Sequence, residues 1–199
     1  MGRGHVDVAA AVLAARAYLV TGQIAFAAAE LDSVRRRAKD PFSAMEVATW
    51  SARARLARAM EGTGAARERA LRGALTRARE AVRLGEQHGY LSGQVLGMAS
   101  VGQAMLLEGD AGQALTWTQR AAELLDDRIA TAVPIEDVLG AYVAALLALG
   151  DDEEAEAARR RARTLLEERA ARLPAAARER FWSLPARRTL REPAASVTG

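Results

Sequence analysis

The sequence predicts an all-α fold of about four helix–turn–helix units, and three observations support this fold class. A glycine precedes an alanine by five residues at three places, each between two stretches of helical apolar periodicity: Gly22 and Ala27, Gly109 and Ala114, and Gly150 and Ala155. Hydrophobic residues make up 50% of the 199 residues, which is enough for a substantial core. Aromatic residues make up only 5%, so we expect helices that approach closely at small side chains.

The turn glycines and the prolines divide the chain into units. The first unit covers residues 6–40 and ends before Pro41, which prevents the next helix from starting earlier. The second unit covers residues 42–89 and contains a linker that we expect to be longer than the others. The third unit covers residues 90–127, and the fourth covers residues 135–173.

The end of the chain differs from the repeated units. A short capping helix is predicted at residues 175–184, so the helical repeat domain covers residues 1–184. Residues 185–199 show no apolar period, and we expect them to form a flexible tail.

Small or compact residues recur at further fixed distances from the turn glycines. Ala15, Gly102 and Val143 each lie seven residues before a turn glycine, and Val34, Ala121 and Ala162 each lie twelve residues after one. This pattern resembles the tetratricopeptide repeat family, most closely over residues 95–124. The resemblance implies a right-handed α-solenoid in which the first helix of each unit lines the concave face.

The segment that follows the fourth unit carries a second resemblance. Arg178, Phe181 and Pro185 are similar in spacing to the end of the repeat regions in large bacterial signalling ATPases, kinases and cyclases. This implies a regulatory or sensing module and a chain that lacks the N-terminal domains of such proteins. The first unit begins in an apolar helix without a polar cap, which predicts either such domains or self-association through this end.

The tetratricopeptide register places one set of residues in a concave partner-binding groove: Val12, Arg16, Leu19, Leu96, Ala99, Gln103, Leu106, Asp137, Ala144 and Leu147. The groove is largely apolar, and only Arg16 resembles the basic residues with which members of this family hold a peptide carboxylate. We therefore predict a non-enzymatic protein–protein interaction scaffold that binds an apolar peptide or helix. Charge substitutions at Leu106 and Leu147 are expected to abolish binding without unfolding.

The sequence gives no catalytic, metal or cofactor site. The chain has no cysteine, and neither His5 nor His88 has a nucleophile or carboxylate partner at helical spacing. The acidic run at residues 151–154 lacks the ligand spacing of a calcium loop and is typical of a helix start. No stretch reaches the roughly 20 apolar residues of a membrane span, so we expect a cytoplasmic protein.

A nucleic-acid-associated regulator is the alternative function. The chain has 28 basic and 25 acidic residues, and its arginines cluster at residues 35–37, 159–163 and 187–191. Consecutive arginines point in different directions on a helix, and no aromatic residue lies among these clusters to stack on bases. A nucleic-acid partner is therefore the less favoured alternative.

Three tryptophans are conspicuous because aromatic residues are scarce. We expect Trp50, Trp117 and Trp182 to pack in the core, with Trp182 covering the end of the repeat array. A tryptophan exposed in a groove would instead mark a contact site.

Overall fold

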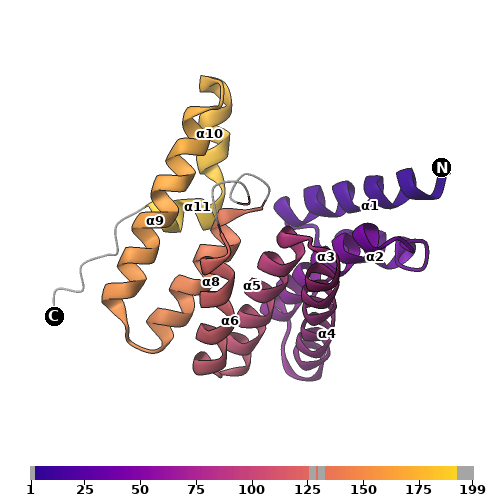
Figure 1. Cartoon of the computed structure of the whole chain (residues 1–199), viewed down its shortest axis with the longest axis horizontal. Coiled ribbons are helices and arrows are strands. Elements are labelled where there is room, and N and C mark those ends of the chain that lie inside the picture. The colour runs from indigo at the N-terminus through magenta and orange to yellow at the C-terminus, as the bar shows by residue number, and fades with distance from the viewer. Residues whose placement is uncertain (1–2, 126–128, 130–132, 192–199) are drawn as a thin grey trace.

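The computed structural model describes residues 3–125, 129 and 133–191, and these residues form ten named α-helices and no β-strand (Figure 1). The prediction of an all-α fold is confirmed. No helix within these residues is both long and apolar enough to cross a membrane. The helices are α1 (Arg3–Val20), α2 (Ile24–Val34), α3 (Pro41–Glu61), α4 (Gly64–His88), α5 (Leu91–Glu108), α6 (Ala111–Glu123), α8 (Ile135–Ala148), α9 (Asp152–Ala171), α10 (Ala175–Ser183) and α11 (Pro185–Arg191).

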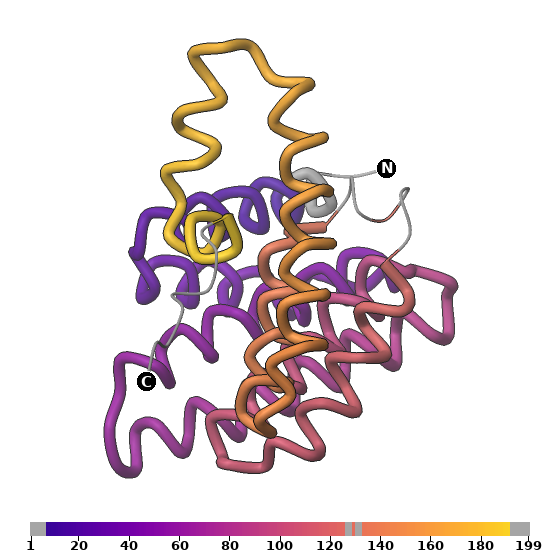
Figure 2. Tube along the Cα trace, turned by 90° about the vertical axis from the view of Figure 1, so that its left-hand side faces the viewer, coloured from indigo at the N-terminus to yellow at the C-terminus, as the bar shows by residue number. Residues whose placement is uncertain are grey.

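Consecutive helices pack against one another in pairs. The pairs are α1 with α2, α3 with α4, α5 with α6, and α8 with α9, and each pair contacts the next. In Figure 1, α5, α6, α8 and α9 run up and down, whereas α1 lies across the picture. Figure 2 shows α10 and the end of α9 projecting together beyond the rest of the chain, and α11 returns to contact α8 and α9.

The turn glycines end the first helix of three pairs, as the sequence predicts. Gly22, Gly109 and Gly150 have φ angles of 74°, 88° and 76°, in the left-handed region that favours glycine. At Gly109 the backbone N–H donates to the Leu106 carbonyl at 3.0 Å, which satisfies one of the last carbonyls of α5. The Asp110 carboxylate then caps the N-terminus of α6. Gly109 therefore ends α5 and Asp110 starts α6, so two adjacent residues define the turn.

The paired helices cross at the small residues that mark the repeat. Four alanines at predicted crossing positions are 0% exposed: Ala15, Ala27, Ala114 and Ala155. At Gly102 in α5, an added Cβ would lie 2.3 Å from Thr118 Cγ2 and 3.1 Å from the Ala114 carbonyl oxygen of α6. This crossing has room for a hydrogen atom but not for a methyl group.

The second pair differs from the sequence-based expectation. Only Gly62 and Thr63 separate α3 from α4, so the prediction of a longer linker is wrong. Ala65 and Ala66 favour helix strongly, and they extend α4 toward its N-terminus instead of forming a loop. The additional residues of this unit lengthen both of its helices.

The expected flexible tail is also corrected in part. Residues Pro185–Arg191 form α11, and Leu190 is buried in the core formed by the third and fourth pairs. The guanidinium of Arg187 donates to Glu136 Oε1 of α8 at 2.8 Å. Arg187 and Arg191 also lie over the rings of Phe181 and Trp182 of α10. These contacts hold the segment without producing an apolar period in the sequence. Residues 192–199 of the predicted tail lie outside the described residues.

Candidate binding cleft

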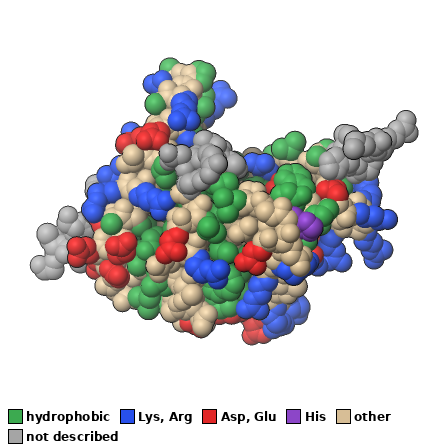
Figure 3. Space-filling model, in the orientation of Figure 1, with side chains coloured by type: hydrophobic (Ala, Val, Ile, Leu, Met, Phe, Trp, Pro, Cys, Tyr) green, Lys and Arg blue, Asp and Glu red, His purple; other side chains and the backbone are tan. Residues whose placement is uncertain are grey.

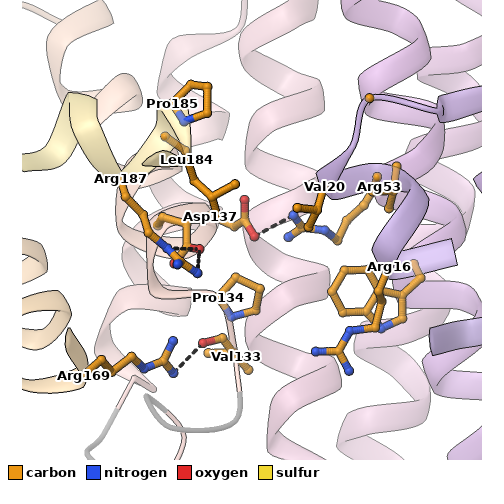
Figure 4. Close-up of a pocket in the computed structure, with 15 residues that line it drawn as sticks. Arg16, Val20, Arg53, Val133, Pro134, Asp137, Arg169, Leu184, Pro185 and Arg187 are labelled. Atoms are coloured by element: carbon orange, nitrogen blue, oxygen red, sulfur yellow. Dashed lines mark hydrogen bonds and ion pairs between the residues drawn. The ribbon is translucent and has the colours of Figure 1, made fainter. Parts of the chain in front are cut away.

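A cleft of about 570 Å³ lies where the first and fourth helix pairs approach each other (Figure 4). One wall is formed by the end of α1 and its turn, the floor by α3, and the opposite wall by α9, α11 and the start of α8. The lining residues are Arg16, Leu19, Val20, Gly22, Trp50, Arg53, Val133, Pro134, Glu136, Asp137, Arg169, Leu184, Pro185, Ala186 and Arg187.

Two arginines hold the indole ring of Trp50 at the floor. The guanidinium carbons of Arg16 and Arg53 lie 4.7 Å and 5.0 Å from the ring centroid, which is within the range of cation–π attraction. Trp50 is only 6% exposed, so the ring supports both side chains while remaining largely covered. On the preceding turn of α3, burial raises the pKa of Glu46, and the Arg16 charge opposes this shift. Arg16 is therefore positioned at the cleft by stacking.

Two ion pairs lie at the cleft, one between its floor and a wall and one within that wall. Arg53 Nη2 lies 2.5 Å from Asp137 Oδ2, and this pair joins α3 to α8. Arg187 Nη2 lies 2.7 Å from Glu136 Oε1, and this pair joins α11 to α8. Burial raises the pKa of Asp137, whereas the neighbouring Arg53 charge lowers it. Two of the four arginines in the cleft are thus neutralised by the protein's own carboxylates.

Arg16 and Arg169 have no ion pair among the described residues. Arg169 donates to the Val133 carbonyl at 2.8 Å. Burial lowers the pKa of its guanidinium, the nearby Glu136 charge opposes this shift, and the Arg187 charge adds to it. Two cationic groups therefore line the cleft beside apolar residues such as Leu184. This combination suits a ligand with an apolar part and an anionic group.

The structure divides the predicted groove residues into three groups. Arg16, Leu19 and Asp137 line the cleft. Val12, Leu96 and Ala99 are buried in the core. The remaining residues are at least partly exposed outside the cleft: Gln103, Leu106, Ala144 and Leu147.

The division follows the distance from the turn glycines. On each first helix, the predicted positions three and six residues before the glycine retain exposure, as Leu106 and Gln103 do. The predicted positions further from the glycine are covered by neighbouring helices, as Val12, Leu96 and Ala99 are. Asp137, at the start of α8, is the exception and is partly exposed. The Gln103 amide lies 3.5 Å from the Asp137 carbonyl oxygen.

Sequence reasoning did not identify most of the charged lining. The predicted groove did not include four charged residues of the lining: Arg53 of α3, Glu136 of α8, Arg169 of α9 and Arg187 of α11. Two sequence signals pointed to parts of this lining: the arginine cluster at residues 187–191 contains Arg187, and the scarcity of aromatic residues singled out Trp50. Its buried ring agrees with the predicted core packing, but its edge also forms part of the cleft.

The arginine clusters do not form one continuous basic surface. Arg159 pairs with Glu156, and Arg161 donates to the carbonyls of Ala122 and Leu125. Basic and acidic side chains are mixed over the face shown in Figure 3. These arginines largely support the fold where their partners are described.

Within the described residues, no group of three or more His, Asp or Glu side chains could hold a metal ion. His88 stacks on Tyr90 with ring centroids 5.9 Å apart, a contact that positions the end of α4. No protein-family model and no curated protein matches this chain.

Proposed function

We propose that this protein is a non-enzymatic protein–protein interaction scaffold whose helix pairs form a right-handed α-solenoid of tetratricopeptide type. The consecutive packing of the pairs and the close crossing at Gly102 support this proposal. The resemblance at Arg178, Phe181 and Pro185 supports a regulatory or sensing role in bacterial signalling, within the cytoplasm.

The ligand that fits the cleft is a short peptide segment of a partner protein. Its apolar side chains pack against residues such as Leu19 and Leu184, and an acidic side chain lies between Arg16 and Arg169. The observation that carries this proposal is that Arg16 and Arg169 line the cleft beside apolar walls and form no ion pair within the described residues. An uncharged segment would cover these cations without adding a counter-charge.

A display library of random short peptides tests the proposal directly. The wild-type chain is expected to enrich sequences that combine apolar residues with an aspartate or glutamate. Arg16→Glu and Ala186→Glu place negative charge on opposite walls of the cleft and should abolish this enrichment. Both side chains are exposed, so the variants should fold as the wild type does.

Arg36→Glu is the matched control, because Arg36 is an exposed arginine just after α2 that does not line the cleft. It should enrich the same peptides as the wild type. The absence of any enriched sequence on the wild type would contradict the proposal. Equal enrichment on all four proteins would show that the peptides bind elsewhere.

A further inference from the structure

The outward face of α1 is an apolar stripe at the surface. The exposed side chains described on this helix are Asp7, Ala9, Ala10, Leu13, Arg16, Ala17 and Val20. Leu13 and Val20 are 61% and 64% exposed, and the apolar positions follow the three- and four-residue spacing of one helix face. Soluble helices usually place polar residues on such a face, so this stripe requires an explanation.

The corresponding positions in the later pairs are buried. Ala10, Leu13 and Ala17 lie twelve, nine and five residues before Gly22. The same distances before Gly109 and Gly150 lead to six buried residues: Gly97, Ser100, Ala104, Val138, Ala141 and Ala145. On the first helices of the third and fourth pairs, this face is therefore covered by other helices, whereas on α1 it is exposed.

The preceding helix pair provides the cover in the third pair. An added Cβ at Gly97 would lie 2.7 Å from Val82 Cγ2 of α4. Ala104 packs in a cluster with Leu71 and Ala74, also of α4. The exposed stripe on α1 thus occupies the position at which one helix pair stacks on another. Helix α1 itself packs mainly against α2 and α3.

The opposite end of the array does not offer a complementary surface. Apart from Ala171, the exposed side chains of α9 are polar or charged: Asp152, Glu153, Glu154, Arg160, Arg161, Thr164, Glu167 and Glu168. Helices α10 and α11 also pack against α9. Head-to-tail association of two copies would place the apolar stripe against this charged surface, which desolvates charges without pairing them. The complementary apolar stripe on a second copy is α1 itself.

We propose that this protein forms a two-fold symmetric dimer in which α1 packs antiparallel against α1 of a second copy. The middle of the stripe is Leu13, so the symmetry axis passes close to this residue. Alanines on both sides of Leu13 allow the two backbones to approach closely, as the small crossing residues do within each pair. Each dimer then carries two of the clefts described above.

Molar mass in solution tests the proposal. Light scattering after size-exclusion chromatography should give about twice the 21.2 kDa chain mass for the wild type. A variant with Leu13→Glu and Ala17→Glu should fall to the mass of one chain, with an unchanged far-UV circular dichroism spectrum because both side chains are exposed. Thr164→Glu, an exposed change on α9, should leave the dimer intact.

Disulfide crosslinking locates the axis, since the chain contains no cysteine of its own. Leu13→Cys should form a covalent dimer under mild oxidation, because the two copies of a residue near a two-fold axis face each other. Thr164→Cys should remain a monomer under denaturing conditions. A wild-type chain that stays monomeric up to millimolar concentration would overturn the proposal and leave a helix pair of another protein to cover α1.

A dimer that survives Leu13→Glu with Ala17→Glu would also overturn it, because the contact would then lie elsewhere. The residues substituted in these tests, Leu13, Ala17 and Thr164, do not line the cleft. Arg16 and Val20, at the end of the stripe, do line the cleft, so the dimer is tested at Leu13 and Ala17, where a change leaves the lining of the cleft intact.

Discussion

Replacing Gly102 by alanine is expected to destabilise the protein, even though alanine is the better helix former. The added methyl group would lie 2.3 Å from Thr118 Cγ2. The Thr118 hydroxyl donates to the Ala114 carbonyl at 2.8 Å, which resists rotation of this side chain. Overpacking costs about 1–3 kcal/mol, and the change from glycine to alanine in a helix returns about 1 kcal/mol. We therefore expect a net loss of about 1 kcal/mol in the free energy of unfolding.

Gly140→Ala in α8 is the matched control. An added Cβ at Gly140 meets no heavy atom within 4 Å, so only the helix-propensity gain of up to about 1 kcal/mol should remain. The two variants should differ by about 2 kcal/mol, or about 4–8 °C in Tm for a chain of this length. Urea and thermal unfolding followed by circular dichroism measure both. If Gly102→Ala equals or exceeds Gly140→Ala in stability, the close crossing of α5 and α6 is refuted.

Other predictions concern α11, pH, the groove and the alternative partner. Leu190→Ala removes a buried leucine and should lower the free energy of unfolding by about 2–5 kcal/mol in urea titrations, whereas a free tail would show no change. Because burial raises the pKa of Glu46 above its ordinary value, folding favours the protonated carboxyl. The stability of the wild type relative to Glu46→Gln should therefore fall as the pH rises above about 4.3, and a difference independent of pH would contradict this. The repeat register predicts that Leu106→Glu with Leu147→Glu abolishes peptide binding, but both residues lie outside the cleft. Peptides selected on the wild type should therefore bind this variant with unchanged affinity, and loss of binding without loss of helical signal would place the peptide in the groove instead. Binding of random-sequence DNA that weakens steeply with added salt would support the nucleic-acid alternative.

The parts of the fold that the sequence predicts are those with local physical causes. A glycine such as Gly109 ends a helix because it adopts a left-handed φ, and a small residue such as Gly102 is required where helices cross. Both signals recur at fixed distances, so the helix pairs could be placed. The start of α4 and the formation of α11 depend instead on helix propensity and on the distant Arg187–Glu136 pair. Turn residues alone do not reveal these causes.

The cleft was less accessible to prediction because its lining comes from five helices. Arg16, Leu19 and Asp137 could be assigned from the register. Arg169 could not, because its role depends on how α9 lies beside the start of α8. The orientation of the first pair relative to the fourth brings the two walls of the cleft together, and a repeat pattern contains no information on that orientation.

The cleft joins the two ends of the helical array, and this arrangement links its width to every interface between them. One wall begins at Arg16 and the other ends at Arg187, with the second and third pairs in between. Small rotations between successive pairs add up along the chain, so they open or narrow the cleft together. A ligand held by both walls would restrain these rotations and make the whole array stiffer. Ligand affinity would in turn depend on the curvature of the array, which couples local binding to long-range elasticity.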